Sequence, residues 1–270
     1  MLETRDLTIR FGGHVAVDRV SCAFTPGTLT AIVGPNGAGK TTYFNLISGQ
    51  LRASEGSVWL SGTDITGETV SARTHRGLGR AFQLTQLFPN LSVLENVRLA
   101  VQSRRREGLN VFSVWLDRRE TLARAQALLD TVRLGDRADA RASSLPHGDQ
   151  RKLEVAMLMA LEPSVYMFDE PTAGMSVDDV PVILDLIRAL KSEADKTILL
   201  VEHKMDVVRE LADRIIVLHN GQLVADGEPE EVIESPIVQQ AYLGLAPEVS
   251  LAAANGPTPI PAFPLKGGRS

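Results

Sequence analysis

The chain has 270 residues, of which 44% are hydrophobic and 23% charged, and these proportions predict a soluble globular protein with a substantial core. Its net charge of −5 provides no global basic field of the kind that favours nucleic acid. The single cysteine, Cys22, excludes an internal disulfide, and the densest apolar run, 155–161, is far shorter than the ~20 residues that span a bilayer, so a membrane connection is expected to come through a partner.

Predicted strands alternate with predicted helices along most of the chain. The apolar run 28–33 lies between two glycines and predicts a strand, and a helix is expected to follow from Lys40, with Gly49 as its stop. Further strands are expected at residues 57–60, 78–82, 165–168, 197–201 and 214–218. Asn220-Gly221 follows the last of these and predicts a two-residue hairpin. The alternation predicts a largely parallel sheet covered by helices.

Residues 85–161 differ from the rest because their apolar positions keep helical spacing. We therefore expect an α/β fold in which this block forms a helical subdomain, inserted between core segments 1–84 and 162–245, with antiparallel strands near the N-terminus. From residue 246 the composition shifts to Pro, Gly, Ala and Ser, which predicts a disordered tail over 246–270.

Residues 34–41 fit the phosphate-binding pattern G-x-x-x-x-G-K-S/T in full, and a predicted strand precedes them while a predicted helix follows. Glycines let backbone N–H groups turn toward phosphate oxygens at the positive end of the helix. Lys40 is expected to reach the β- and γ-phosphates, and Thr41 to hold Mg²⁺; the alternative is a plain glycine-rich turn. Contacts to a nucleoside triphosphate are expected from Gly34, Pro35, Asn36, Gly37, Ala38, Gly39, Lys40, Thr41 and Thr42.

Two further strand ends carry candidate catalytic groups. Strand 165–168 is followed by Asp169, which is expected to orient Mg²⁺ through water, and by Glu170, which is expected to polarise the attacking water. Strand 197–201 leads into Glu202 and His203, and His203 is a candidate contact to the γ-phosphate because it lies at the same edge of the sheet. A helix-capping role for the acids and a structural role for the histidine are the alternatives.

Taken together, these motifs resemble those of ABC transporter ATPase subunits over about residues 2–243. The motifs are the phosphate loop, FQLTQLF at 82–88, LPHGDQR at 145–151, VYMFDEP at 165–171 and VEH at 201–203. The chain looks more closely like the ATP-binding subunits of branched-chain amino acid importers and their urea and amide relatives. That likeness lies in FGGHVAV at 11–17, GPNGAGKTT at 34–42, GLGRAFQ at 77–83, RKLEVA at 151–156 and AYLG at 241–244.

The resemblance implies a P-loop NTPase core of the RecA type, ATP and Mg²⁺ as cofactors, and two further site residues. Phe11 matches the aromatic that stacks on adenine, and Gln83 matches the glutamine that contacts Mg²⁺ and the water and senses the membrane subunit. The region 85–97 would form part of a groove for a cytoplasmic helix of the permease. Such subunits sit peripherally on the cytoplasmic face of the membrane and serve a solute-binding protein indirectly.

These ATPases act in pairs, with ATP held between the phosphate loop of one subunit and the signature loop of the other. Five residues stand in the place of the family signature LSGGQ: Leu145, Pro146, His147, Gly148 and Asp149. Proline suits the first turn of a helix, but Pro146 lacks the hydroxyl and the N–H that would contact the opposite γ-phosphate. This asymmetry favours a heterodimer with a distinct second ATPase over a homodimer. Ser176 also departs, since many members carry aspartate there.

Other functions fit part of this pattern. A lipopolysaccharide-type exporter shares many of the motifs, and a non-transport ABC protein acting on ribosomes or DNA shares the ATPase. The latter class has two cassettes in one chain or a long coiled coil, whereas this chain has one cassette and no heptad run. We therefore expect no nucleic-acid partner. The cargo is expected to be selected by other subunits.

Overall fold

The computed structural model describes residues 1–81, 87–105, 114–236 and 238. The strands are β1 (Leu2–Phe11), β2 (His14–Phe24), β3 (Leu29–Val33), β4 (Glu55–Leu60), β5 (Thr63–Asp64), β6 (Leu78–Ala81), β7 (Val165–Asp169), β8 (Thr197–Val201), β9 (Arg214–His219) and β10 (Gln222–Gly227). The helices are α1 (Lys40–Ser48), α2 (Val70–His75), α3 (Val93–Arg105), α4 (Val114–Thr131), α5 (His147–Ala160), α6 (Val180–Lys191), α7 (Met205–Leu211) and α8 (Pro229–Glu234).

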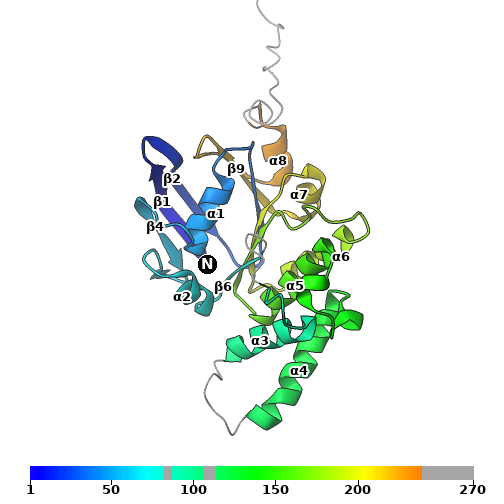
Figure 1. Ribbon diagram of the computed structural model, residues 1–270. Coiled ribbons are helices and arrows are strands. Elements are labelled where there is room, and N and C mark those ends of the chain that lie inside the picture. Colours follow the sequence, from blue (N-terminus) through cyan, green and yellow to red (C-terminus); the bar gives the residue numbers. More distant parts are fainter. Residues whose placement is uncertain (82–86, 106–113, 237, 239–270) are drawn as a thin grey trace, which may run out of the picture.

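The strands form two sheets (Figure 1). In the larger sheet, of order β10-β9-β3-β8-β7-β6, the neighbours pair in parallel except for the β9–β10 hairpin. Asn220 (φ 49°) and Gly221 (φ 78°) make the turn of that hairpin, because both adopt the positive φ that a tight hairpin turn requires. The smaller sheet, β2-β1-β4-β5, is antiparallel. The expected parallel sheet, hairpin and N-terminal antiparallel region are confirmed.

Helix α1 lies between the two sheets (Figure 1), and its apolar side chains share one core with both. Every residue of β3, β7 and β8 is buried, because helices cover both faces of these central strands. Helices α3, α4, α5 and α6 contribute to the core on the other face of the sheet. Helices α7 and α8 pack near β3 and β9.

Alternation along β7 determines which side chains face α1. Val165 and Met167 belong to the core that contains α1, whereas Tyr166 and Phe168 belong to the core of the opposite face. Successive residues of a strand point to opposite faces, so Asp169 is turned to the same side as Val165 and Met167. The carboxylate therefore projects toward the helix that follows the phosphate loop.

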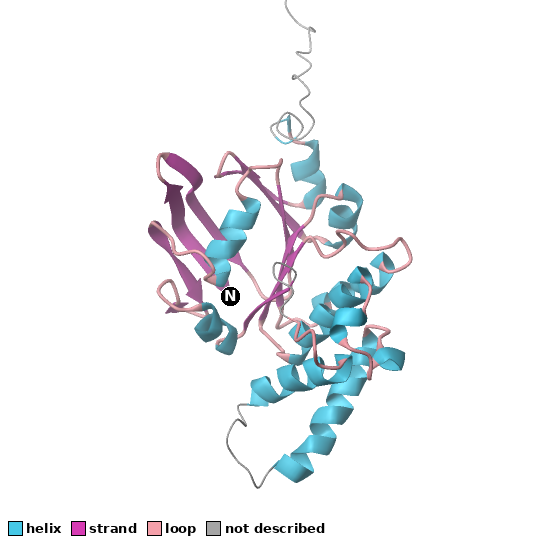
Figure 2. Cartoon of the chain, viewed as in Figure 1, coloured by secondary structure: helices cyan, strands magenta, loops and turns pink. Residues whose placement is uncertain are grey.

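Residues 85–161 are mostly helical where they are described, as expected, and Figure 2 shows this helical region below the strands. Helix α3 contacts both α4 and α5. Val97 on α3 and Leu129 on α4 belong to the same core as Phe168 on β7 and Ile187 on α6, so the block is joined to the sheet through a continuous apolar core. The boundaries at 84 and 161 stay a prediction, and 246–270 lies outside the described residues.

Within the described ranges, no helix has the length and apolarity that crossing a bilayer requires.

Candidate functional site

Residues 34–41 join β3 to α1, as the motif requires. Gly34 (φ 153°) and Gly39 (φ 97°) lie where a side chain cannot fit. A Cβ atom on Gly34 would lie 2.2 Å from the carbonyl oxygen of Leu218, and one on Gly39 would lie 2.5 Å from that of Ala16. The loop is therefore pressed against β9 and β2, and only glycine allows this close approach of backbones.

Lys40 is buried and folds back over the loop. Its Nζ donates hydrogen bonds to the carbonyl oxygens of Gly34 (2.6 Å) and Pro35 (2.9 Å). Burial lowers the pKa of the Lys40 ammonium, and the negative charges of Glu170 and Asp169 oppose that shift. The cation thus lies within electrostatic reach of the two strand-end acids.

The other residues of the loop differ in their exposure. Asn36 and Gly37 are exposed, Ala38 is buried, and Thr41 and Thr42 begin α1 with Thr41 exposed. No side chain caps the N-terminus of α1, whose N-cap residue is Gly39. The first-turn N–H groups of a helix lack intrahelical partners, and phosphate oxygens are suitable acceptors for them.

Asp169 and Arg80 form a buried ion pair. The Nη2 atom of Arg80 donates to the Oδ2 atom of Asp169 over 2.7 Å, and the two side chains are only 7% and 5% exposed. Arg80 also donates through Nη1 to Asn45 (2.7 Å), Ser48 (2.9 Å) and Gln50 (3.1 Å). Burial raises the pKa of the Asp169 carboxyl, against the pull of the Arg80 guanidinium. We assigned Arg80 no role from the sequence, although it lies within GLGRAFQ.

The side chains expected to hold Mg²⁺ fit that ion chemically. Thr41 offers a hydroxyl oxygen and Asp169 a carboxylate oxygen, the hard donors that Mg²⁺ prefers. No group of three or more His, Cys, Asp or Glu side chains suited to a metal occurs in the described part of the chain. Mg²⁺ commonly takes one or two protein ligands and completes its coordination with phosphate oxygens and water.

Glu170 and His203 meet at the edge where β7 and β8 end. The two strands are parallel neighbours with Asp169 opposite Val201, and the Oε1 atom of Glu170 lies 2.7 Å from Nε2 of His203. Glu170 has φ 51°, a left-handed conformation that costs free energy in a residue other than glycine. Its N–H donates to the carbonyl of Val201 over 2.8 Å, which holds that conformation. His203 therefore lies at the same edge of the sheet as Asp169 and Glu170, and the catalytic roles of these side chains stay predictions.

Glu202 is a buried carboxylate to which we assigned no role of its own from the sequence. Its carboxylate accepts hydrogen bonds from the Thr172 hydroxyl and from the backbone N–H of His203, the latter over 2.8 Å. It therefore ties the segment after β7 to the segment after β8. Its position directly after an apolar strand was the sequence feature that could have indicated this role.

The structure describes only one of the two residues, Phe11 and Gln83, that were assigned through the resemblance. Phe11 ends β1 and is 50% exposed, an unusual position for a phenylalanine and one that leaves its ring accessible for stacking. Gln83 lies outside the described residues, so its place in the site stays a prediction.

The signature segment forms the start of α5. Leu145 is buried, Pro146 and His147 are exposed, and Gly148 and Asp149 are half-buried. We expected Pro146 in the first helical turn, but it is the N-cap residue, one position earlier, with φ −57° and ψ 156°. Proline suits this place because an N-cap residue has extended backbone, yet it provides no side-chain cap.

An ion-pair cluster joins the signature segment to α6. The ammonium of Lys152 pairs with Asp149 (3.2 Å) and with Asp179, and Asp179 accepts a hydrogen bond from the Ser176 hydroxyl over 2.7 Å. Arg137 pairs with Asp149 over 2.7 Å. The hydrogen bond from Lys152 lowers the pKa of Asp179. Ser176, which departs from the usual aspartate, is thus connected through Asp179 to the start of α5.

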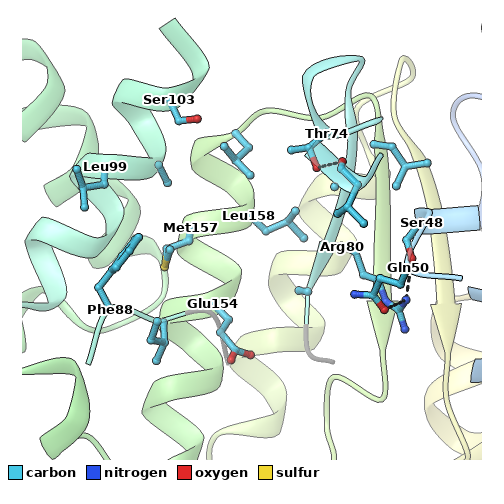
Figure 3. Close-up of a pocket in the computed structure, with 17 residues that line it drawn as sticks. Ser48, Gln50, Thr74, Arg80, Phe88, Leu99, Ser103, Glu154, Met157 and Leu158 are labelled. Atoms are coloured by element: carbon cyan, nitrogen blue, oxygen red, sulfur yellow. Dashed lines mark hydrogen bonds between the residues drawn. The ribbon is translucent and has the colours of Figure 1, made fainter. Parts of the chain in front are cut away.

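A cavity of about 400 Å³, which we call the groove, lies between the strand β6 and the helices α3 and α5 (Figure 3). Its lining is mostly apolar and includes Phe88, Leu99 and Met157. Arg80 and Glu154 are its charged lining residues within the described part of the chain. The groove is bordered in part by Leu87 and Phe88, within the region that the resemblance assigns to a membrane partner.

Comparisons with known proteins agree with this geometry. Residues 17–173 match the ABC transporter family model. The chain is 36% identical over 253 residues to the high-affinity branched-chain amino acid transport ATP-binding protein LivG of Escherichia coli, which covers 91% of this chain and 98% of that protein. BraF of Pseudomonas aeruginosa, also a high-affinity branched-chain amino acid transport ATP-binding protein, shows the same identity and coverage.

Solved structures show the same fold. An ATP-binding cassette of an ABC transporter in its ADP conformation has a TM-score of 0.75 and 30% identity, over 91% of this chain and 99% of that chain. A dimeric cassette in a post-hydrolysis state, bound to ADP and phosphate, has a TM-score of 0.74 and 26% identity, over 85% of this chain and 99% of that chain.

Proposed function

This chain belongs to the ABC transporter family as an ATP-hydrolysing subunit, and we propose that it powers an importer of branched-chain amino acids. The observation that carries the ATPase assignment is the meeting of the phosphate loop, the buried Asp169 and the Glu170–His203 pair at one edge of the sheet. The cargo is proposed because relatives that cover 91% of the chain are ATP-binding proteins of branched-chain amino acid transport.

In the proposed mechanism, Lys40 leaves the loop carbonyls and binds the β- and γ-phosphates of ATP, while Phe11 stacks on the adenine. Thr41 and Asp169, together with Gln83, would hold Mg²⁺, which when bound neutralises charge on the phosphates. The other residues of 34–42 surround the phosphates, and all of them except Pro35, which has no N–H, offer backbone N–H groups.

Glu170 is the proposed general base. A carboxylate has two oxygens that accept hydrogen bonds, and Oε1 of Glu170 already lies against His203, so Oε2 is available to accept a proton from the attacking water. His203 thereby orients the base, and its imidazole is also the proposed contact to the γ-phosphate.

Subunits of this family dimerise and work with membrane permease subunits. We propose that this chain pairs with a distinct second ATPase, because Pro146 offers neither a hydroxyl nor an N–H to the opposite γ-phosphate, and such a weakened signature in both halves of a homodimer would affect both sites. Leu145, His147, Gly148 and Asp149 complete the proposed trans contact.

The groove is the proposed site for a cytoplasmic helix of the permease, since it lies between the proposed core (1–84 and 162–245) and the helical block (85–161). In this arrangement the chain sits peripherally on the cytoplasmic face of the membrane, serves a solute-binding protein only indirectly and has no nucleic-acid partner.

The test is purification of the intact complex from its source membranes through a tag on this chain. We expect permease subunits and a second ATPase to copurify, and we expect leucine, isoleucine or valine, with the binding protein, to stimulate ATP hydrolysis in proteoliposomes. Stimulation by urea or short amides alone would replace the cargo assignment. Copurification of ribosomes, or export of a lipid by the complex, would contradict import.

A further inference from the structure

The groove contains a carboxylate in mostly apolar surroundings. Glu154 projects from α5 beside Met157 and Leu158, and Figure 3 shows it among the side chains that line the groove, with Arg80 on another wall. The residue is half-buried. Within the described ranges, no hydrogen bond or ion pair joins the carboxylate of Glu154 to another side chain.

Among the described residues, no lysine or arginine forms an ion pair with this carboxylate. Arg80 is the other charged residue of the groove within the described part, and its guanidinium is engaged with Asp169, Asn45 and Ser48. Arg151, on the same helix, acts on Glu154 only as a charge at a distance that partly opposes the effect of burial. Burial raises the pKa of the Glu154 carboxyl to about 7.

A carboxylate in apolar surroundings is unfavourable unless a partner compensates its charge. The isolated chain bears that cost, whereas a partner that brings a positive charge into the groove would offset it. The neighbouring surface is suited to the rest of such a partner, because Phe88, Leu99 and Met157 present apolar side chains to the same cavity.

We propose that the occupant of the groove is an amphipathic helical segment of the permease that places a lysine or arginine against Glu154. This inference rests on the proposed function, which assigns the groove to the permease. A purely apolar helix would leave the carboxylate uncompensated, and an acidic one would be repelled. Glu154 is therefore a specificity-determining residue that selects permeases by the charge on their docking helix.

The test measures binding of the purified full-length chain to source membranes that hold the permease and have been stripped of their own ATPase subunits. Four proteins are compared: wild type, Glu154→Gln, Glu154→Lys and the control Glu193→Gln, in which an exposed carboxylate outside the groove lining is neutralised. Loss of a charge-assisted contact should weaken binding roughly tenfold or more in Glu154→Gln. Glu154→Lys should weaken it further, and the control should bind like wild type.

A pH series separates charge from shape. Binding of wild type should weaken as the pH falls from about 8 to about 6, because the carboxyl then takes up a proton, while Glu154→Gln should show no such dependence. The guanidinium groups of Arg151 and Arg80 stay charged across this range. Wild-type binding that tightens at low pH would overturn the inference, since it would mean that the partner prefers a neutral group.

Thermal unfolding of the isolated proteins checks that each variant is folded. Glu154→Gln should have a melting temperature no lower than that of wild type. Equal binding of wild type and Glu154→Gln would overturn the inference while leaving the permease assignment intact. Absence of wild-type binding would contradict the proposed function itself. Where the docking helix has been mapped by cross-linking, exchange of its basic residue for glutamate should restore binding of Glu154→Lys.

Discussion

At the scale of single residues, the two neighbouring acids at the end of β7 have different partners. Asp169 and Glu170 are adjacent, yet Asp169 is turned into the buried face beside α1 while Glu170 pairs with His203 at the sheet edge. Glu170 adopts a left-handed φ, and its N–H donates to the carbonyl of Val201. Two neighbouring acids can therefore take different roles.

Replacement of Glu170 tests the role of the base. Glu170→Gln keeps the shape and the contact to His203 but removes the proton acceptor, so ATP binding should persist while hydrolysis falls by roughly 100-fold or more. Nucleotide affinity by fluorescence titration and phosphate release by the assembled complex measure the two effects. Hydrolysis near the wild-type rate would rule out Glu170 as the base.

Glu154 predicts a pH-dependent term in the stability of the isolated chain. The folded chain holds this proton with a pKa of about 7 against an ordinary value of 4.5, so the folded state binds more protons between these values. Stability from this group is therefore present at low pH and is lost as the pH rises through about 7.

Glu154→Gln should remove that dependence and raise the free energy of unfolding at about pH 8 by about 1–2 kcal/mol. Urea denaturation at several pH values measures this, with Glu193→Gln as the control. A variant whose stability falls with pH as steeply as that of wild type would show that another group is responsible.

At the scale of elements, the Arg80–Asp169 pair connects β6, β7 and α1. Removal of one partner leaves a buried charge uncompensated, so Arg80→Met should lower the free energy of unfolding by about 3–5 kcal/mol. The double variant Arg80→Met with Asp169→Leu should be less destabilised than Arg80→Met alone, because no charge is then left buried. Denaturant unfolding of the single and double variants measures this, and equal losses would contradict the pairing.

Helix α5 joins two surfaces that would otherwise be separate. Its first turn carries the signature segment and, through Lys152 and Asp179, contacts the start of α6, while its middle presents Glu154 and Met157 to the groove. The helix shares its core with α3, α4 and β7, so the signature segment and the groove wall belong to one packed unit.

At the scale of the whole assembly, Pro146 affects whether the second ATPase of the dimer is a copy of this chain or a different subunit. Pro146→Ser restores a hydroxyl and an N–H at the proposed trans contact, so ATP hydrolysis by the assembled complex should rise, up to roughly tenfold. Steady-state hydrolysis in the purified complex measures this, with the isolated subunit as the control. An unchanged rate would mean that the backbone of the signature segment suffices.

The sequence alone determined the features that depend on neighbours along the chain. The phosphate loop, the β9–β10 hairpin and the strand ends at Asp169 and His203 follow from glycine positions and from apolar runs of strand length. Their meeting at one edge was also predictable, because the carboxyl ends of parallel strands share an edge. Gln83 remains a prediction, since it lies outside the described residues.

Only the tertiary structure decided which charges are paired. Arg80 and Asp169 are 89 residues apart in the sequence and meet because β6 lies beside β7 and both side chains face α1. Glu154 reads in the sequence as an ordinary polar position on a helix, and only the packing of α3, α5 and β6 encloses it in the groove, where no described side chain forms an ion pair with it. Burial and pairing depend on which elements become neighbours in the folded chain, and local pattern does not encode that.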